Sequence, residues 1–182
     1  MIAGIDEAGR GPLAGPVVAS AVILRSVNFI NRIDDSKKMT PRSRERSFRE
    51  IFKKAIVGIG IVDERTIDEI NIYRATKRAM ELAVKDLSSA PDHIIVDGNM
   101  GISAACPVKC IVKGDSKSMS IAAASIVAKV TRDRIMKKYD SLYPVYGFSR
   151  HKGYPTPFHK EAIKKNGPSP IHRMTFRPVR EL

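Results

Sequence analysis

Four acidic residues stand at or near the ends of apolar segments that are typical of β-strands. Asp6 and Glu7 interrupt the segment that begins at residue 2. Asp97 closes the segment HIIVD, and Asp115 follows CIVKG. Carboxylates that converge at one edge of a sheet repel one another, and a divalent hard cation relieves that repulsion. Each acid alone is explained better as a turn or cap residue, but four at strand ends indicate a site for Mg²⁺ or Mn²⁺.

A basic chain surrounds these acids. Lys and Arg number 32 against 19 Asp and Glu, which gives a net charge of +13 at pH 7. Such a balance favours a polyanionic partner, although a soluble protein that is merely basic is the plain alternative. Two divalent ions can bind the attacking and leaving oxygens of an in-line phosphoryl displacement. An acidic centre in a basic protein therefore predicts hydrolysis of a phosphodiester polyanion.

The segment GRGPLAGP, residues 9–16, carries three glycines between two expected strands. Glycines let a backbone approach a ligand and expose N–H groups, but a tight hairpin turn needs them as well. Arg10 is stronger evidence for a phosphate contact than the glycines are. It lies between two glycines and three residues after Glu7, where a guanidinium can meet a phosphate.

The expected elements form an α/β protein. Strands over 2–5 and 17–24 flank the glycine turn and predict a hairpin. A helix over 42–54, a strand over 55–62 and a helix from a Thr66 cap to about residue 87 follow. Strands over 93–96 and 107–112, a helix over 118–139 and a short helix over 156–166 complete the chain. This order predicts a mixed sheet, antiparallel first and parallel later. We expect a catalytic domain over 1–140 and a basic helical extension over 141–182 packed on it.

Membrane and secreted classes are excluded by the patterning. No apolar run reaches the roughly 18 residues of a membrane-spanning helix, and the first residues lack the pattern of a signal peptide. Cys106 and Cys110 are too few for a zinc site and are expected as free thiols. We therefore expect a cytoplasmic protein.

Several blocks of the sequence carry a family resemblance. The opening IAGIDEAGRGPLAGPVV resembles the signature of ribonuclease HII, the type 2 ribonuclease H family. The resemblance continues through DSKKMTP, HIIVDGN and KGDSKSMSIAAASIVAKVTRDR, and ends in HKGYPT and HRMTF. These blocks occur in order over nearly the whole chain.

The resemblance implies an RNase H-like fold, with a mixed five-stranded sheet flanked by helices and a small helical C-terminal part. It implies cleavage of RNA in RNA–DNA hybrids, and cleavage on the 5′ side of single ribonucleotides embedded in duplex DNA. The products carry 3′-hydroxyl and 5′-phosphate ends, and the implied roles are ribonucleotide removal and RNA primer removal. Two Mg²⁺ or Mn²⁺ ions act in the substrate complex, and the protein is expected as a monomer.

The family's functional residues fall on identifiable positions of this chain. Its four metal-binding acids match those already selected: Asp6, Glu7, Asp97 and Asp115. Its GRG motif, whose backbone reads the ribose 2′-hydroxyl, matches Gly9, Arg10 and Gly11. Tyr154 matches the tyrosine that packs on the adjoining deoxyribose, with a half-buried core tyrosine as the alternative.

Weaker expectations concern polar residues around these motifs. Lys37 and Lys38 are expected to meet phosphates, although a solvated loop explains them nearly as well. Ser116 and Ser118 adjoin Asp115 and serve either as a helix cap or as a phosphate contact. We expect the histidines of the C-terminal part at the surface or against phosphates.

Two other functions are compatible with parts of this pattern. A type 3 ribonuclease H has an additional N-terminal substrate-binding domain, for which a first strand at residue 2 leaves no room. The loss of one of the four acids would favour a non-catalytic RNA–DNA hybrid-binding protein, but all four are present. The expected partners are therefore hybrid duplexes and ribonucleotide-containing DNA, cut by an active enzyme.

Overall fold

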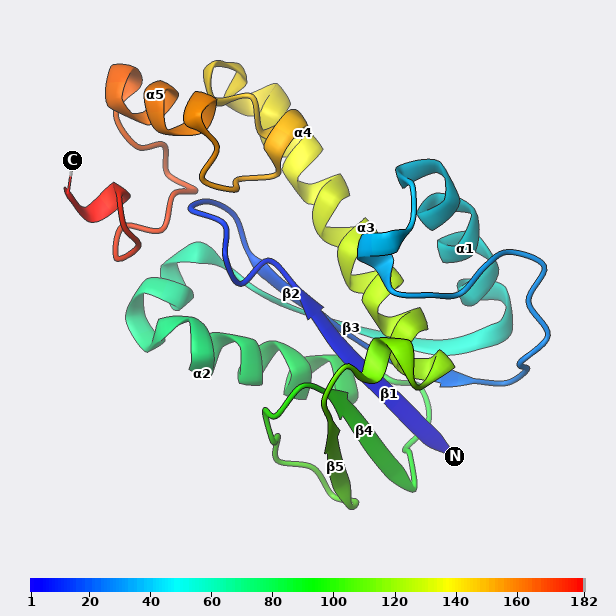
Figure 1. The fold of residues 1–182 in the computed structure, drawn as a ribbon. Helices are drawn as coiled ribbons and strands as arrows, with labels where there is room; N and C mark the ends of the chain where they lie inside the picture. Colours follow the sequence, from blue (N-terminus) through cyan, green and yellow to red (C-terminus); the bar gives the residue numbers. More distant parts are fainter. Residues whose placement is uncertain (182) are drawn as a thin grey trace.

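The computed structural model describes residues 1–181 and contains one mixed sheet of five strands (Figure 1). The strand order is β3-β2-β1-β4-β5. Strand β1 pairs antiparallel with β2 and parallel with β4, while β3 joins β2 antiparallel and β5 joins β4 in parallel. The bounds are Ile2–Ala8, Val17–Leu24, Ala55–Val62, His93–Asp97 and Val108–Ile111 for β1 to β5. The expected α/β class and mixed sheet are confirmed.

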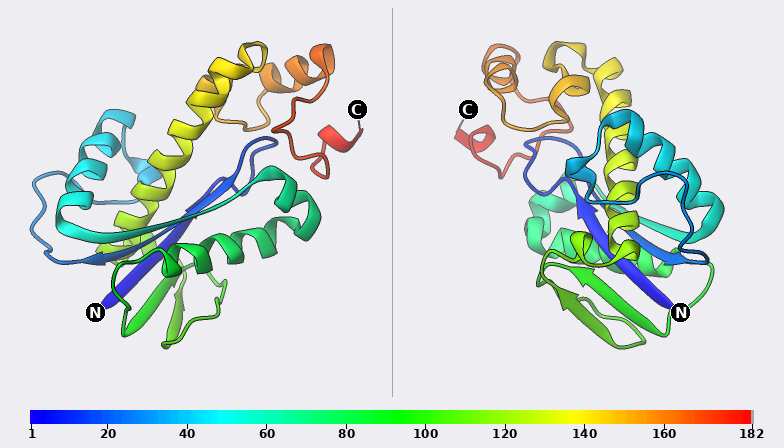
Figure 2. Two further views of the ribbon diagram at one scale, coloured as in Figure 1. Left: turned by 180° about the vertical axis from the view of Figure 1, so that it is seen from behind. Right: turned by 45° about the vertical axis from the view of Figure 1, so that its right-hand side comes forward.

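Helices cover both faces of this sheet. Helix α2 (Glu64–Lys85) packs on one face, and α1 (Pro41–Lys54) and α3 (Met119–Leu142) cover the other (Figures 1 and 2). Two short helices, α4 (Phe148–His151) and α5 (Pro157–Asn166), follow α3 and lie beside the β1–β2 turn in both views of Figure 2. A cluster of buried apolar residues joins these helices to Leu13 and Ala14 of that turn. The C-terminal segment therefore packs on the loop that the sequence marked as functional.

Close packing fixes α3 against β1 near the acidic residues. A Cβ added at Gly4 would lie 2.3 Å from the backbone carbon of Ser120, so only glycine allows this approach. The first turns of α3 bury the run Ala122–Ala124 against the sheet. Small residues on both partners thus bring the start of α3 close to Asp6, two residues after Gly4.

Three local expectations need correction. Strand β1 runs to Ala8, so Asp6 and Glu7 lie within it, because β2 provides partners as far as Val18. The cap of α2 is Asp63, whose side chain accepts a hydrogen bond from the Thr66 backbone N–H. The C-terminal tail contains α4 as well as α5, because Gly147 supplies the left-handed backbone that starts a separate helix.

None of the helices in the described part of the chain combines the length and hydropathy that a membrane span requires.

Candidate active site

The sheet register places acids from two parallel strands next to each other. Ile5 of β1 pairs with Val96 of β4, so Asp6 and Asp97 follow at the same end of neighbouring strands. Asp115 lies in the 3-10 turn η2 (Gly114–Ser116), which follows β5. The Gly114 backbone N–H donates to Asp97 Oδ1 at 2.6 Å and ties this turn to β4.

The acids on β1 and β4 influence one another electrostatically. Burial raises the pKa of Asp6 well above its usual range, and the carboxylates of Glu7 and Asp97 raise it further. Burial also raises the pKa of Glu7, against the lowering effect of Arg10, whose Nη1 lies 3.4 Å from Glu7 Oε1. The Glu7 backbone N–H donates to Asp6 Oδ1 at 2.7 Å, which partly stabilises the buried carboxylate. The fold holds these acids together at an energetic cost.

Asp115 belongs to the same group of charges. Burial raises its pKa, and Asp35 and Asp97 add to the rise. Asp35 is an acid that the sequence analysis did not select. It caps the 3-10 turn η1 (Ser36–Lys38) by accepting from the Lys37 backbone N–H at 2.9 Å. The available sequence signal for Asp35 was its position at the start of DSKKMTP, one of the blocks that carry the family resemblance.

The donor set fits a hard divalent cation that is only partly held by protein. Among residues 1–181, no three His, Cys, Asp or Glu side chains are gathered closely enough to hold a metal ion by themselves. Mg²⁺ keeps several waters and takes only one or two carboxylates together with substrate phosphates. Carboxylates that repel one another at one edge of the sheet match that preference.

A cleft of about 200 Å³ joins the acids on β1 to the glycine turn. Ser125 of α3 lies at its floor, with its hydroxyl 2.7 Å from that of Ser36. Arg10 and Tyr154 are both exposed at its rim. Of the residues predicted from sequence, the cleft brings together Asp6, Glu7, Gly9, Arg10, Gly11, Lys37 and Tyr154.

Two buried arginines fix the shape of the glycine turn. Arg173 is fully buried and donates to the carbonyls of Gly9, Arg10 and Gly15 at distances of 2.6–3.0 Å. Arg132 of α3 is equally buried and donates to the carbonyls of Pro16, Ala14 and Lys152 at 2.9–3.0 Å. Both arginines escaped the sequence analysis as functional residues. Each occurs in a block that carried the resemblance, VTRDR and HRMTF, and that was the only signal.

The other predicted phosphate contacts lie outside the cleft lining. Lys38 and Ser116 are exposed, and the Ser116 hydroxyl donates to the Lys113 carbonyl at 2.8 Å. Ser118 occupies the N-cap position of α3 but makes no side-chain cap, and its hydroxyl lies 3.0 Å from that of Ser120. Their contact with a substrate stays a prediction.

The expectation of surface histidines is wrong for the C-terminal part. His159 and His172 are buried, with 0% and 2% of their surface exposed, and His151 is half-buried. Aromatic packing explains this burial, because the Phe148 ring lies edge-on to His159 and tilted against His172.

Comparisons with known proteins show what this chain is similar to. A family model described as Ribonuclease HII matches residues 3–179. The Ribonuclease HII of Acetivibrio thermocellus is 61% identical over 177 residues, which cover 97% of this chain and 69% of that protein. The Ribonuclease HII of Geobacter sulfurreducens is 56% identical over 181 residues, covering 99% of this chain and 83% of that protein.

Solved structures show the same architecture. The ribonuclease H2 from Pyrococcus horikoshii OT3 has a TM-score of 0.84 at 30% identity, covering 99% of this chain and 95% of that one. Bst-RNase HIII in complex with Mn²⁺ has a TM-score of 0.75 at 18% identity, covering 99% of this chain and 68% of that one, a likeness that concerns the fold alone. The RNase H-like fold expected from the sequence is confirmed.

Proposed function

The chain belongs to the ribonuclease HII family, and from that premise we propose that it cuts RNA in RNA–DNA hybrids and nicks duplex DNA on the 5′ side of a single embedded ribonucleotide. Membership makes the chain a ribonuclease H, an endonuclease that acts on nucleic acid. The observation that carries the proposal is the cleft, because it joins the acids on β1 to the glycine turn and to Tyr154. Acids suit hydrolysis of a phosphodiester, and the turn and ring suit recognition of a ribose.

We assign the metal-holding role to the four acids at the sheet edge. When bound, two divalent ions supply a water of lowered pKa and a counter-charge for the leaving 3′ oxygen. Support comes from the electrostatics of the carboxylates, because burial raises the pKa of Asp6 and of Asp115 and repulsion by neighbouring carboxylates raises each further. Carboxylates must be deprotonated to ligate, so these raised pKa values couple metal affinity to pH. The assigned ligands are Asp6, Glu7, Asp97 and Asp115, with Mg²⁺ or Mn²⁺ as the ions.

The glycine turn is assigned to recognition of the ribose 2′-hydroxyl. That hydroxyl is the group by which a protein distinguishes RNA from DNA at a given position in a duplex. Gly9 has a φ of 99°, so its backbone takes a conformation that exposes peptide groups and that other residues rarely adopt. The 2′-hydroxyl serves recognition and not attack, because its attack on phosphorus would leave a 5′-hydroxyl on the other fragment. Lys37 and Lys129 also line the cleft, and we assign them to attraction of the scissile phosphate.

Tyr154 is assigned to the deoxyribose next to the ribonucleotide. Its side chain is 44% exposed and lies over Gly11, with its ring 3.7 Å from the position that a Cβ on Gly11 would take. A ring at this position packs on a sugar that lacks a 2′-hydroxyl and is crowded by one that carries it. This assignment predicts a preference for the RNA–DNA junction over uniform hybrid.

The test is a nicking assay with three duplexes in Mg²⁺ or Mn²⁺. A duplex with one ribonucleotide should be cut on its 5′ side, a hybrid should be cut within its RNA strand, and all-DNA duplex should stay intact. Product ends should be 3′-hydroxyl and 5′-phosphate. Equal cutting of the all-DNA duplex would refute the proposed specificity.

Two variants separate chemistry from recognition. Asp115→Asn should abolish nicking and leave duplex binding in place, while Tyr154→Ala should keep hybrid cleavage and lose the junction preference. Retained nicking in Asp115→Asn would remove that residue from the metal site. A non-catalytic hybrid-binding protein would bind both RNA-containing duplexes and cut neither.

The proposed setting is the cytoplasm, where the chain acts as a monomer in ribonucleotide removal from DNA and in RNA primer removal. The unpaired thiols of Cys106 and Cys110 suit a reducing compartment. Sedimentation with and without duplex tests the monomer, which should bind one duplex per chain.

A further inference from the structure

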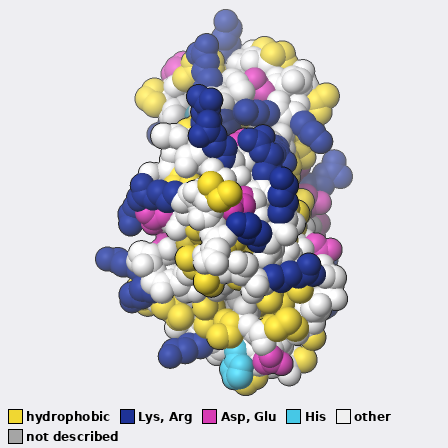
Figure 3. All heavy atoms as spheres, turned by 90° about the vertical axis from the view of Figure 1, so that its right-hand side faces the viewer, with side chains coloured by type: hydrophobic (Ala, Val, Ile, Leu, Met, Phe, Trp, Pro, Cys, Tyr) yellow, Lys and Arg dark blue, Asp and Glu magenta, His cyan; other side chains and the backbone are white. Residues whose placement is uncertain are grey.

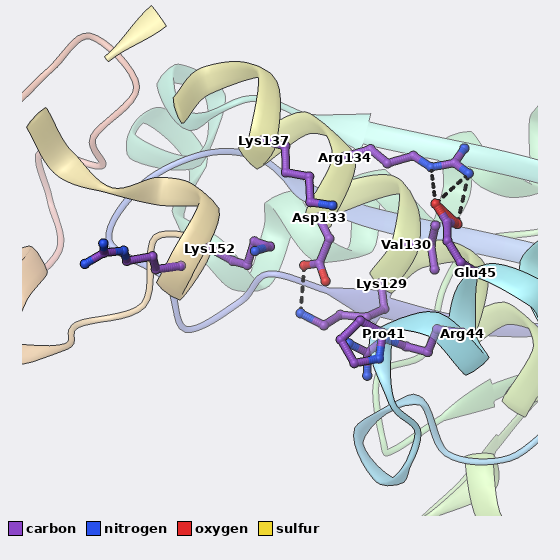
Figure 4. Close-up of a pocket in the computed structure, with 10 residues that line it drawn as sticks. Pro41, Arg44, Glu45, Lys129, Val130, Asp133, Arg134, Lys137 and Lys152 are labelled. Atoms are coloured by element: carbon purple, nitrogen blue, oxygen red, sulfur yellow. Dashed lines mark hydrogen bonds and ion pairs between the residues drawn. The ribbon is translucent and has the colours of Figure 1, made fainter. Parts of the chain in front are cut away.

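A basic groove lies next to the proposed active site, between α1 and α3 and toward α4 (Figure 4). It has a volume of about 270 Å³ and meets the cleft at Lys129, which lines both. Figure 4 shows Arg44, Lys129 and Lys137 arranged around it, and Figure 3 shows Lys and Arg side chains over much of one face of the protein. Its charged lining residues are Arg44, Glu45, Lys129, Asp133, Arg134, Lys137, Arg150 and Lys152.

Both acids in this lining are already paired. Asp133 Oδ1 accepts from Lys129 Nζ at 2.8 Å, and Glu45 accepts from Arg134 at 2.9 Å through both carboxylate oxygens. Within residues 1–181, no carboxylate lies at ion-pair distance from the remaining cations of the lining, Arg44, Lys137, Arg150 and Lys152. The groove therefore carries uncompensated positive charge.

The cations of the groove also act on one another. Burial lowers the pKa of Lys152, and the charges of Lys129 and Lys137 lower it further against the opposing effect of Asp133. An anion between them would relieve this repulsion. Apart from Pro41 and Val130 the lining is polar and contains no aromatic ring, so it has no surface on which a base could stack.

We propose that this groove binds the sugar–phosphate backbone of the substrate duplex, beyond the nucleotides held in the active-site cleft. The proposal rests on the proposed function, because the duplex in the cleft must continue past Lys129 to reach the groove. Contacts to phosphate fix the register of a duplex without reading its sequence. The groove thus positions the duplex so that the ribonucleotide meets the glycine turn.

Neighbouring lysines of α3 provide a matched test. Lys137 lines the groove, whereas Lys138 is also exposed on the same helix and does not line it. Lys137→Ala should weaken duplex binding about threefold to fivefold at low salt, as expected for one exposed ion contact. Loss of one phosphate contact also lowers the salt slope by about one, so this difference should shrink about 3.5-fold between about 50 and about 200 mM salt. Lys138→Ala should match the wild type in both measurements.

Binding is measured without divalent metal, so the result does not depend on cleavage. With metal present, Lys137→Ala should raise KM and leave kcat at saturating duplex unchanged. Shortening the duplex arm on one side of the ribonucleotide should abolish the difference between Lys137→Ala and wild type, and shortening the other arm should not. If Lys137→Ala and Lys138→Ala bind alike at low salt, the groove proposal is wrong, whereas absent nicking by the wild type would refute the proposed function only.

A second inference concerns a chain of hydrogen bonds through the buried histidines. The Ser169 backbone N–H donates to His172 Nδ1 at 2.8 Å, so that nitrogen carries no proton. His172 Nε2 therefore carries the proton and donates to His159 Nε2 at 3.1 Å. His159 Nδ1 is left to donate to the Tyr154 carbonyl at 2.9 Å. One tautomer of each ring satisfies all three contacts.

The geometry points to His159 as a positioning residue for Tyr154, acting through its backbone carbonyl. His159 belongs to helix α5. The series of hydrogen bonds that begins at the Tyr154 carbonyl passes through His159 and His172 and ends at Ser169, which is buried in the C-terminal core. Burial lowers the pKa of both histidines to about 4, so both rings are neutral near pH 7. The ring of Tyr154 at the cleft rim is thereby tied to a part of the protein that water does not reach.

Two amide variants of His159 separate positioning from packing. His159→Asn places an amide N–H near the position of Nδ1 and should keep the preference for an RNA–DNA junction over uniform hybrid. His159→Gln places its amide toward His172 and should lose most of that preference, with kcat on uniform hybrid little changed. The melting temperatures of the two variants are measured as the control for packing.

The outcomes distinguish this inference from the role proposed for Tyr154. Equal junction preference in His159→Asn and His159→Gln would show that the ring only fills space. If Tyr154→Ala itself keeps the junction preference, the proposed role of Tyr154 and this inference both fall. If Tyr154→Ala loses the preference while His159→Gln keeps it, only the positioning role of His159 is refuted.

Discussion

The fully buried guanidinium of Arg173 offers the most direct test of how the glycine turn is held. Four hydrogen bonds join it to the carbonyls of Gly9, Arg10 and Gly15. Burial lowers its pKa to about 9, so it keeps its charge near pH 7. Replacing it with Met keeps an unbranched side chain in the core but leaves these three carbonyls without their donor.

The structure sets the expected loss of stability for Arg173→Met. A buried polar group left without its partner costs about 1–3 kcal/mol, so three such carbonyls cost about 3–6 kcal/mol after partial relaxation. For a chain of this size, 1 kcal/mol shifts Tm by about 2–4 °C. We expect a free-energy loss of about 4 kcal/mol and a fall in Tm of about 8–16 °C.

The assay compares Arg173→Met with a nearby surface arginine. Arg177 is exposed and pairs with Glu181 at 2.8 Å, so Arg177→Met should change the free energy of unfolding by less than about 0.5 kcal/mol. Thermal melts followed by circular dichroism give Tm for both. Nicking, measured well below either Tm, should be reduced in Arg173→Met alone, because the backbone of the glycine turn is no longer fixed. A Tm for Arg173→Met equal to that of Arg177→Met would refute the proposal that Arg173 holds the glycine turn.

Three other predictions follow from the same structure. Asp6→Asn should raise the Tm of the metal-free protein, because it removes a buried carboxylate that its neighbours repel, and a lower Tm would contradict this. The same variant should reduce nicking by more than the roughly 100-fold that is typical for losing a residue that only supports a metal ligand. His159 and His172 have folded pKa values of about 4 against 6.5 unfolded, so the unfolded chain binds more protons between these values. Urea unfolding should therefore show stability that is fully present above pH 6.5 and falls as pH drops toward 4, by up to about 3 kcal/mol per histidine, and a flat profile would count against burial. Gly4→Ala should cost at least the roughly 1–3 kcal/mol of overpacking by thermal melt, whereas Gly101→Ala, with nothing within 4 Å of the added Cβ, should be near neutral.

The neighbouring strand positions of Asp6 and Asp97 could be predicted from sequence because their signal is local. Asp97 closes a short apolar strand and Asp6 lies inside another, and parallel pairing then brings such positions together. The same reasoning gave the mixed sheet, since the hairpin and the later crossovers are marked by apolar runs of different spacing. Apolar runs, and the polar residues that interrupt them, are formed by neighbours in sequence, so they can be recognised without a structure.

The contacts of the two buried arginines and the hydrogen bonds through the buried histidines could not be predicted, because the residues that they join are distant in sequence. Arg173 and Gly9 are 164 residues apart, and Arg132 and Pro16 are 116 apart. In a chain with 32 Lys and Arg residues, one arginine gives no sign of being buried. Burial of His172 likewise depends on aromatic rings that only the fold brings beside it.

The position of these arginines explains why recognition and chemistry can share one short segment. Gly9 follows Glu7 by two residues, so the backbone that is proposed to read the ribose and the carboxylate that is proposed to hold metal are set by the same stretch of chain. Strand pairing fixes one end of this stretch, since Glu7 pairs with Ala19. The other end leaves the sheet and would be free to move if the guanidinium did not hold the carbonyls of Gly9 and Arg10. A movement of about 1 Å at a positioning group can cost about 100-fold in rate. The proposed roles therefore predict that the C-terminal segment affects catalysis through the distance between the ribose at the glycine turn and the phosphate at the carboxylates.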